Sequence, residues 1–466
     1  MESRPPIASP RLGTAGVCFA LFTAAFLFYT LAWPDAPITK TDTLDYLDAA
    51  ADLKDFEIDQ FQGRPPGFPL LLLITGSADA PKRALFVAQL LMSFGSIGML
   101  AWILARSGLP AAATLLFVLV MLTPPLMQTA AFALSEVTAT FLITSGFLAL
   151  FYALRRDRPS LLALASMLFG AAALTRPSFL LLGPLLAAPT AAFYLRGLRL
   201  DWKNWRRPLL VALLLIGPSS AVVGSYWLYN GVRFGRFSVT PYVGYNLAVR
   251  TTYLYEDLED EVIRDILIEH RSRALAAGEN VYWTVYFAGS DLKRATGLSQ
   301  LALGERLKEL CLEVIKKRPI AYLKDAAGSF AEIWFPYVTE LPLVNSTLGK
   351  AFGYTLQFLI MSAFFVVTLA NIGGTLAYGG FSQLDRALVV AFVCALLTVF
   401  SNAAVSSLLD FGETRQRVAT DPLIVWSVFA GGWLWLRRPA SAFDQGRVAE
   451  LGSRAKNQRR AYSSPR

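Results

Sequence analysis

The chain has 466 residues, of which 55% are hydrophobic and 17% charged, whereas an average soluble domain carries about 25% charged residues. These figures exclude intrinsic disorder and argue against a soluble enzyme. Three cysteines and a single histidine, His270, cannot form a disulfide framework, a zinc cage or a histidine-based triad. Any chemistry must therefore use carboxylates, arginine, lysine, tyrosine or the backbone.

The net charge of +9 resembles that of nucleic-acid-binding proteins, but membrane proteins also gather Lys and Arg on their cytoplasmic loops. With the N-terminus inside, the inner segments carry more than twice as many Lys and Arg residues as the short outer loops. Topology therefore explains the basic charge. Nucleic acid is not an expected partner, and both termini are expected in the cytoplasm.

Ten apolar stretches approach the length of about 20 residues that a helix needs to cross a bilayer. We interpret the first as an anchor and not as a signal peptide, because no small-residue cleavage site precedes the acidic stretch that follows it. The third, fifth and tenth are short, so one of them is a candidate re-entrant segment. The ten spans are 12–33, 83–105, 109–125, 136–154, 160–175, 178–195, 208–229, 352–377, 387–407 and 420–436.

The long loops divide the chain into four expected parts. Residues 1–229 form an N-terminal membrane module with a first outer loop at 34–82, and residues 230–350 form a small, mainly helical outer domain. Residues 351–436 supply the C-terminal transmembrane helices, and 437–466 form a basic cytoplasmic tail that we expect to be disordered. Function is expected in the two outer regions.

The first outer loop contains an acidic stripe. Its aspartates recur every three or four residues and share one face of a predicted helix: Asp42, Asp45, Asp48, Asp52, Asp55 and Asp59. Most of them suit a solvated helix face, with Asp42 as an N-cap. Asp42 and Asp45 differ because they come directly after the membrane exit, where partial burial raises a carboxyl pKa and favours general-base chemistry.

A Pro-Gly turn follows in the sequence Gly63-Arg64-Pro65-Pro66-Gly67-Phe68-Pro69. The prolines end any helix and the glycine permits a sharp turn, so we expect the chain to re-enter the membrane edge. Arg64 at this boundary suits a phosphate, to which a guanidinium donates paired hydrogen bonds. The alternative, which the turn alone does not exclude, is an arginine that only anchors the turn.

Further charged residues lie at the predicted outer ends of the spans: Glu136, Arg176, Arg233, Arg236, Glu413 and Arg415. An acid beside an apolar span is costly unless it is paired or functional, although Glu136 also suits the N-terminus of its helix. Arg176 either neutralises Glu136 or holds an anionic ligand. Acids and arginines gathered around a re-entrant loop are suited to a lipid phosphate and a hydroxyl acceptor.

In this order, the segments Thr41-Asp42-Thr43-Leu44-Asp45-Tyr46, Gly63 to Pro69, Leu134-Ser135-Glu136, Leu174-Thr175-Arg176-Pro177 and Gly412 to Arg417 resemble integral-membrane glycosyltransferases of the GT-C class. The likeness is to the branch related to protein O-mannosyltransferases and the aminoarabinose lipid A transferase. The chain has Arg-Pro-Pro where the mannosyltransferases have His-Pro-Pro, and no β-rich domain is evident, so protein O-mannosylation is not implied.

The resemblance implies an all-α, GT-C-like bundle of about ten transmembrane helices in a bacterial plasma membrane, with a re-entrant first outer loop, a small outer domain and an active site facing the exterior. It implies inverting sugar transfer from a polyprenyl-phosphate donor to a hydroxyl or amine of a lipid, glycan or protein acceptor, with membrane lipids as further partners. Asp42 corresponds to the catalytic base, Glu136 to a second acid and Arg64 to the donor-phosphate ligand.

Other roles stay open at the level of sequence. Asp45 is the alternative base; Arg176, Arg233 and Arg236 are further phosphate ligands; Tyr46, Glu413 and Arg415 are additional site candidates. No metal ligands and no cofactor are required, although some GT-C enzymes use a divalent cation and the acids here permit one.

Two rival interpretations remain. Ten spans with both termini inside also suit a secondary transporter, but the paired half-repeats with interrupted helices that are typical of transporters are not evident. A lipid-linked glycan polymerase or ligase is chemically adjacent and acts on a longer glycan.

Overall fold

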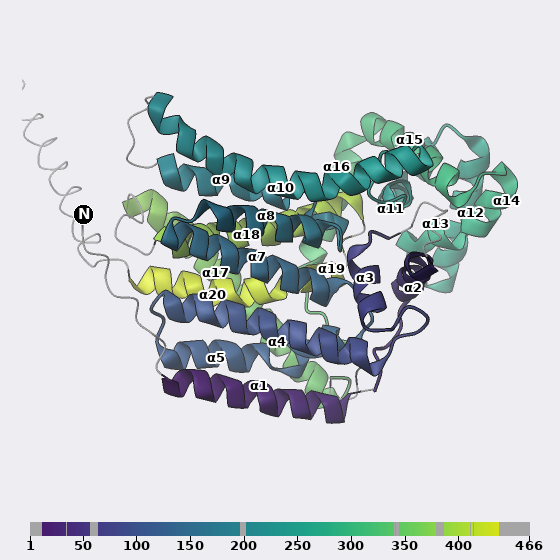
Figure 1. The fold of residues 1–466 in the computed structure, drawn as a ribbon. Helices are drawn as coiled ribbons and strands as arrows, with labels where there is room; N and C mark the ends of the chain where they lie inside the picture. The colour runs from purple at the N-terminus through teal and green to yellow at the C-terminus, as the bar shows by residue number, and fades with distance from the viewer. Residues whose placement is uncertain are drawn as a thin grey trace, which may run out of the picture.

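The computed structural model describes residues 12–33, 35–55, 64–195, 202–339, 341, 344–378, 386–410, 412 and 414–437. Most of these residues are helical, and within them the pairing of strands is limited to one isolated parallel bridge, between Ile38 and Phe132. The long helices lie side by side along one direction (Figure 1). They are α1 (Leu12–Ala32), α4 (Arg83–Arg106), α5 (Ala111–Met121), α7 (Glu136–Arg156), α8 (Pro159–Ala173), α9 (Leu182–Leu195), α10 (Trp202–Phe234), α17 (Thr347–Tyr378), α18 (Arg386–Leu409) and α20 (Asp421–Leu436).

Seven described helices are long and apolar enough to cross a membrane. An eighth candidate is α5 together with the short segment from Pro124 to Ala131, bent by 65°. Pro124 and Pro125 explain the bend, because proline breaks the backbone hydrogen-bond ladder of a helix. The remaining two of the ten spans predicted from the sequence are α8, with 15 residues, and α20, with 16. These three are the spans that the sequence singled out as short.

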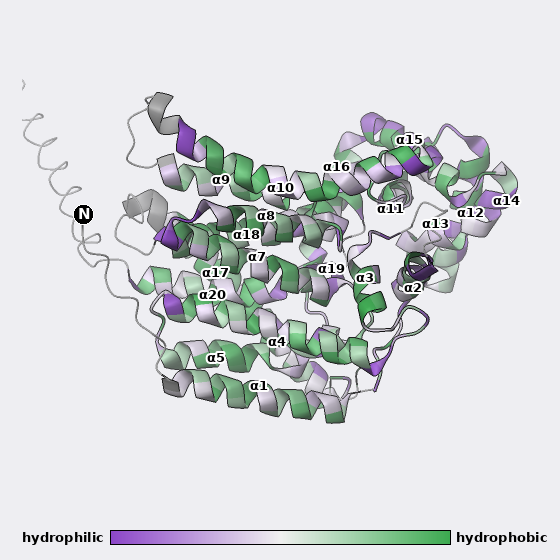
Figure 2. Ribbon diagram, in the orientation of Figure 1, coloured by the Kyte–Doolittle hydropathy of each residue, from purple (hydrophilic) through white to green (hydrophobic). Residues whose placement is uncertain are grey.

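Most residues of the bundle helices are hydrophobic (Figure 2), as is typical of helices surrounded by lipid and by other helices. Their inward faces form the main hydrophobic core, in which Phe117, Phe147 and Trp426 are fully buried. The all-α, multi-pass architecture expected from the sequence is confirmed.

Further helices gather at one end of the bundle, on the right in Figure 1. This end of the bundle is called the site end below. Its helices are α2 (Thr41–Asp55), α3 (Gly67–Ile74), α11 (Val243–Arg250), α12 (Glu261–Ala277), α13 (Thr284–Phe287), α14 (Gly289–Thr296), α15 (Gln300–Lys317), α16 (Pro319–Glu332) and α19 (Thr414–Arg417). Polar residues are concentrated at this end (Figure 2).

Helices α11 to α15 share a hydrophobic core of their own, centred on Leu267, Leu303 and Leu307. Arg250 on α11, whose side chain is fully buried, donates to Ser329 Oγ at 2.7 Å and pairs with Asp325, both on α16. This ion pair fixes the small helical unit against α16.

The predicted division into domains stays a prediction. Helix α10 continues past residue 229 and α17 begins before residue 351, so both cross a predicted boundary. Residues 438–466, most of the predicted disordered tail, lie outside the described residues.

The starts of α2 and α7 are tied together at the site end. The Ile38 amide donates to the Ala131 carbonyl at 2.8 Å, and the Ala133 amide donates to the Ile38 carbonyl at 3.0 Å. The Thr43 hydroxyl donates to the Ala133 carbonyl at 3.0 Å. Because Asp42 and Glu136 follow directly after these segments, the bridge brings the two acids to the same place.

Helix α3 docks on the turn after α8. The Gly67 amide donates to the Leu174 carbonyl at 2.9 Å, while Phe68 and Leu72 are fully buried. This contact places the preceding Arg64 near Arg176.

Gly67→Ala is expected to destabilise the protein by about 1–3 kcal/mol, the usual cost of overpacking. An added Cβ would lie 2.8 Å from the Leu174 carbonyl oxygen and 2.9 Å from Thr175 Cα, both backbone atoms that cannot rotate away. Thermal unfolding in lipid nanodiscs measures the effect. Gly217→Ala is the matched control, because a Cβ there meets nothing within 4 Å; an equal loss in both variants would contradict the docking argument.

Candidate active site

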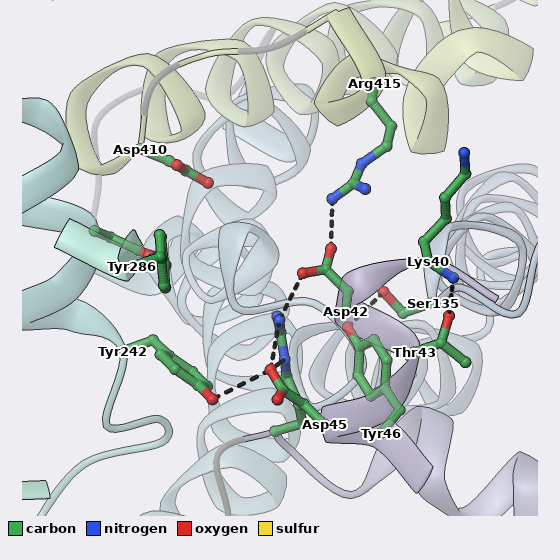
Figure 3. A network of polar contacts seen from close by, with 12 residues as sticks. Lys40, Asp42, Thr43, Asp45, Tyr46, Ser135, Tyr242, Tyr286, Asp410 and Arg415 are labelled. Carbon is green, nitrogen blue, oxygen red and sulfur yellow. Dashed lines mark hydrogen bonds and ion pairs between the residues drawn. The ribbon is translucent and has the colours of Figure 1, made fainter. Parts of the chain in front are cut away.

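The carboxylate of Asp42 lies between two guanidinium groups from distant parts of the chain. Arg64 Nη2 is 2.8 Å from Asp42 Oδ1, and Arg415 Nη2 donates to Asp42 Oδ2 (Figure 3). The Asp42 side chain is 22% exposed. Both oxygens of this acid are therefore engaged by charge-assisted hydrogen bonds, which are roughly twice as strong as neutral ones.

Arg64 also joins Asp42 to the second aspartate of the stripe. Its Nη2 atom is 3.1 Å from Asp45 Oδ2, which accepts a further hydrogen bond from the Tyr242 hydroxyl at 3.2 Å. The guanidinium lies 5.0 Å from the ring centroid of Tyr46 and 5.1 Å from that of Tyr242, which are favourable cation–π contacts. Arg64 is thus held in one orientation by two acids and two aromatic rings.

Glu136 forms the buried side of the cluster and is 4% exposed. Its Oε1 atom lies 2.7 Å from Arg176 Nη1 and 3.8 Å from Arg415 Nε. Its Oε2 atom is buried and accepts no hydrogen bond from any residue that the structure describes. A buried acceptor without a partner is costly, so this oxygen is suited to a hydroxyl of a bound molecule.

These contacts balance the charge of the cluster: three acids (Asp42, Asp45 and Glu136) face three arginines (Arg64, Arg176 and Arg415). Asp42 and Glu136 also occupy the first turns of α2 and α7. Helix N-termini carry a partial positive charge, so the site suits an additional anionic group.

The charges set the acidity of Asp42. Burial raises the pKa of this carboxyl, but the guanidiniums of Arg64 and Arg415 and the more distant Arg176 outweigh burial and lower the pKa below its usual value of 3.8. Burial raises the pKa of Tyr46, whose hydroxyl donates to Ser135 Oγ at 3.0 Å. Asp42 is therefore ionised and Tyr46 neutral near neutral pH.

Arg415→Gln is expected to move the acidic limb of the kcat/KM profile to higher pH. A base acts only when it is deprotonated, and removing Arg415 removes a charge and a hydrogen bond that lower the pKa of Asp42. Because kcat/KM reports the free enzyme, the midpoint of the wild-type acidic limb is expected below pH 3.8. The midpoint for the variant is expected at a higher pH than that of the wild type. An unchanged limb would show that Asp42 is not the titrating group.

The two other candidate arginines lie at the end of α10 and directly after it. Arg236 lies 3.8 Å from Glu305 on α15, and Arg233 is exposed near the end of α10. Neither is among the described contacts of the three acids, so their phosphate-binding role stays a prediction. Asp48 and Asp55 are exposed on α2, as expected of a solvated face. Glu413 and Asp59 lie outside the described residues.

Sequence reasoning did not single out Tyr242, Tyr286 or Asp410. Figure 3 shows these three residues on one side of Asp42 and Asp45, opposite Ser135, with Tyr286 and Asp410 beside one another. The available signal was the aromatic content of the 230–350 loop, which names no individual residue. Ser135 entered only as part of the segment Leu134-Ser135-Glu136, without a role of its own.

A divalent cation does not fit the cluster as it stands. Among the described residues, no group of three or more His, Cys, Asp or Glu side chains is arranged to hold a metal ion. The three acids are each paired with arginine, which competes with a cation for the same oxygens. Participation of a metal therefore stays a prediction from the family resemblance.

A narrow groove leads from Arg64 along the side of α10. Arg64 and Pro66 line one end, and the rest of the lining comes from α2 and the last turns of α10: Ala49, Leu53, Tyr226, Tyr229, Asn230 and Phe234. Tyr229 is 40% exposed on the apolar helix α10. The groove therefore joins the arginine to a surface suited to lipid.

No family model and no curated protein matches the chain. Among solved structures, the chain is similar to the archaeal oligosaccharyltransferase AglB from Archaeoglobus fulgidus in complex with an inhibitory peptide and a dolichol-phosphate. The identity is 14% and the TM-score 0.46, covering 96% of this chain and 52% of that chain. For the apo form of the A. fulgidus enzyme the TM-score is 0.47 at 14% identity, covering 89% and 50%.

The chain is also similar to ArnT from Cupriavidus metallidurans bound to undecaprenyl phosphate, at 14% identity and a TM-score of 0.35, covering 93% of this chain and 80% of that chain. Both enzymes are GT-C membrane glycosyltransferases, the class that the sequence resembles. The chain spans about half the length of the oligosaccharyltransferase. With TM-scores below 0.5, these likenesses carry no argument about substrate or mechanism.

Proposed function

We propose that this chain is a GT-C-type glycosyltransferase that moves a sugar from a polyprenyl-phosphate donor to a hydroxyl or amine acceptor at the outer face of a bacterial plasma membrane. The observation that carries the proposal is the Asp42 carboxylate held between Arg64 and Arg415 at one end of an apolar bundle. The proposed general base, Asp42, is thereby hydrogen-bonded directly to both of the proposed phosphate ligands, Arg64 and Arg415.

The donor phosphate is expected to bind to Arg64 and Arg415. Guanidinium groups pair well with phosphoryl oxygens, and a phosphate that takes these hydrogen bonds releases the oxygens of Asp42. The groove beside Arg64 provides an apolar path for the first part of the polyprenyl chain. Donor binding would therefore both place the leaving group and free the base.

In the reaction, the acceptor oxygen or nitrogen attacks the anomeric carbon while the bond from that carbon to the phosphate oxygen breaks. Asp42 takes the acceptor proton, and a single displacement inverts the anomeric configuration. The phosphate gains one negative charge as Asp42 loses one, so the total charge of the site stays constant. Arg64 and Arg415 stabilise the charge that develops on the phosphate.

Glu136 is proposed to orient the acceptor. Its unpartnered Oε2 atom can accept a hydrogen bond from the attacking group, while the ion pair with Arg176 holds the carboxylate in place. Tyr46 and Tyr242 hold Arg64 through their rings and stay neutral. The lipid, glycan or protein nature of the acceptor is left open by these contacts alone.

The proposal is tested with purified protein in lipid nanodiscs, radiolabelled polyprenyl-phosphate sugars and a cell-envelope extract as acceptor. We expect label to leave the polyprenyl phosphate and to appear on an envelope component, with inverted anomeric configuration. If label stays on the donor for every sugar while the protein carries solutes across proteoliposome membranes, the chain is a transporter. Transfer to a growing glycan chain would identify the polymerase or ligase instead.

A further inference from the structure

Three tyrosines of the small helical unit form a wall beside the acid and arginine cluster: Tyr242, Tyr245 and Tyr286, called the tyrosine wall. The rings of Tyr245 and Tyr286 are stacked, with centroids 6.0 Å apart and an interplanar angle of 17°. Tyr242 meets Tyr245 edge to face, also at 6.0 Å. Trp283 supports Tyr286 from α13's N-cap, at 5.4 Å.

The wall is fixed in position at both ends. The Tyr242 hydroxyl donates to Asp45, and the Tyr286 hydroxyl donates to Asn246 Oδ1 at 3.3 Å. Tyr245 is buried at 4% exposure, whereas Tyr286 is 38% exposed. Tyr286 is therefore supported by a buried aromatic ring and keeps part of its surface exposed to a ligand.

Tyr286 lies within the electrostatic influence of the active site. Burial of its hydroxyl, together with the negative charge of Asp410, raises its pKa, so the ring stays neutral. Asp410 lies beside Tyr286 in Figure 3, and its carboxylate accepts a hydrogen bond from Gln416, the neighbour of Arg415. The Tyr286 ring and the Asp410 carboxylate thus lie on the same side of Asp42 (Figure 3).

We propose that Tyr286 and Asp410 form an acceptor subsite for a pyranose ring, so that the acceptor is a glycan-bearing molecule. The axial C–H groups of a pyranose form an apolar patch that packs on the electron-rich face of an aromatic ring. Its hydroxyls donate to carboxylate and amide oxygens, which Asp410 and Asn246 supply. This inference rests on the proposed function and names its acceptor class.

We assign the subsite to the acceptor and not to the donor because its tyrosine lies on the small helical unit and not in the lining of the groove beside Arg64. The groove beside Arg64 is formed with α10, a membrane helix, and suits a lipid-linked donor that arrives sideways. Tyr286 lies on α13, within the helical unit that packs its own core at the polar end of the molecule. Asp42 is joined to the donor side by its hydrogen bond with Arg64, which lines the groove.

The test begins with binding, independent of transfer. Saturation-transfer NMR is recorded with methyl glucopyranoside, galactopyranoside and mannopyranoside and their N-acetylamino counterparts. Protein in nanodiscs free of glycoside detergent is compared with Tyr286→Ala, Tyr286→Phe and Tyr253→Ala. Tyr253 is the matched control, because it is 52% exposed on the same unit and its ring meets Tyr282 instead. We expect at least one sugar to bind the wild type, with about tenfold weaker binding to Tyr286→Ala alone.

Acceptor titrations then use the glycolipid, protein and phospholipid fractions of a cell envelope. We expect the label to be transferred to a glycan-bearing fraction. This transfer is expected to be lost when the acceptor is first oxidised with periodate. We also expect a KM for that acceptor about tenfold higher in Tyr286→Ala, with the donor KM and the melting temperature unchanged within error. Equal binding of sugars to wild type and Tyr286→Ala, or label only in periodate-resistant protein, would overturn the subsite. Sugar binding without any transfer would instead refute the proposed function.

Discussion

Asp42→Asn is expected to reduce sugar transfer by about 10²–10⁴-fold, the range in which a general base contributes. The amide has the shape of the carboxylate and can accept a hydrogen bond through its oxygen, but it cannot take the acceptor proton. Donor binding is expected to persist, because Arg64 and Arg415 remain and are released from their pairing with Asp42. Single-turnover rates with a saturating labelled donor measure the chemical step.

Two variants on the same helix separate this role from the alternatives. Asp55→Asn, an exposed residue in the last turn of α2, is expected to leave the rate within about twofold of the wild type, as surface changes usually do. Asp45→Asn tests the other candidate base. If Asp45→Asn abolishes transfer while Asp42→Asn keeps it, the roles of the two aspartates are exchanged.

Arg64→Gln is expected to lower kcat/KM for the donor by about 10²–10³-fold, the usual cost of removing one group that stabilises transition-state charge. The change removes the bridge between Asp42 and Asp45 and leaves two negative charges near each other. Arg64→Lys is expected to recover little of the lost kcat/KM, because lysine is a point charge that cannot reproduce the paired hydrogen bonds of a guanidinium. Donor titrations, with kcat and KM resolved separately, measure both effects.

Arg83→Gln serves as the control for Arg64. Arg83 starts α4 and pairs with Asp35 in an ion pair whose side chains are 59% and 84% exposed. Exposed pairs contribute little, so activity and stability should stay close to the wild type. Equal activity of Arg64→Gln and Arg83→Gln would remove Arg64 from the phosphate site.

The membrane architecture follows closely from the sequence, because the length of an apolar run is a direct physical requirement of the bilayer. The Pro124-Pro125 pair gives the bend in the third span, and the aspartate spacing gives the helical form of α2. These features are local, so each depends on residues that are neighbours in the chain. The same holds for the turn that ends at Gly67.

The partners within the site are less accessible to sequence reasoning. The resemblance grouped Asp42, Glu136 and Arg64 by role, and the charges gave Glu136 as one possible partner of Arg176, which the structure shows. Neither showed that Arg415 shares the Asp42 carboxylate. Arg233 and Arg236 have the same local signal, an arginine near a span end, yet the described partner of Arg236 is Glu305 on α15 and not one of the three acids. Which arginine meets which acid depends on helix packing, and the pattern of charges along the chain does not encode that packing.

Tyr242 and Tyr286 illustrate a second limit. Tyrosine is common in packed helical units, and seventeen occur in this chain. Only the way α11 and α13 pack places these two at the site. Residue type alone does not distinguish these two from the other tyrosines; only their position in the fold does.

The contact between Asp42 and Arg415 spans 373 positions of the chain. A ribosome that adds about 5–20 residues per second reaches Arg415 roughly 20–70 s after it has passed Asp42. A nascent chain therefore contains its acidic residues long before their last cationic partner exists. The proposed base and its phosphate ligands can assemble only after residue 415 has been added, so a chain truncated before that residue is expected to insert in the membrane without acquiring activity.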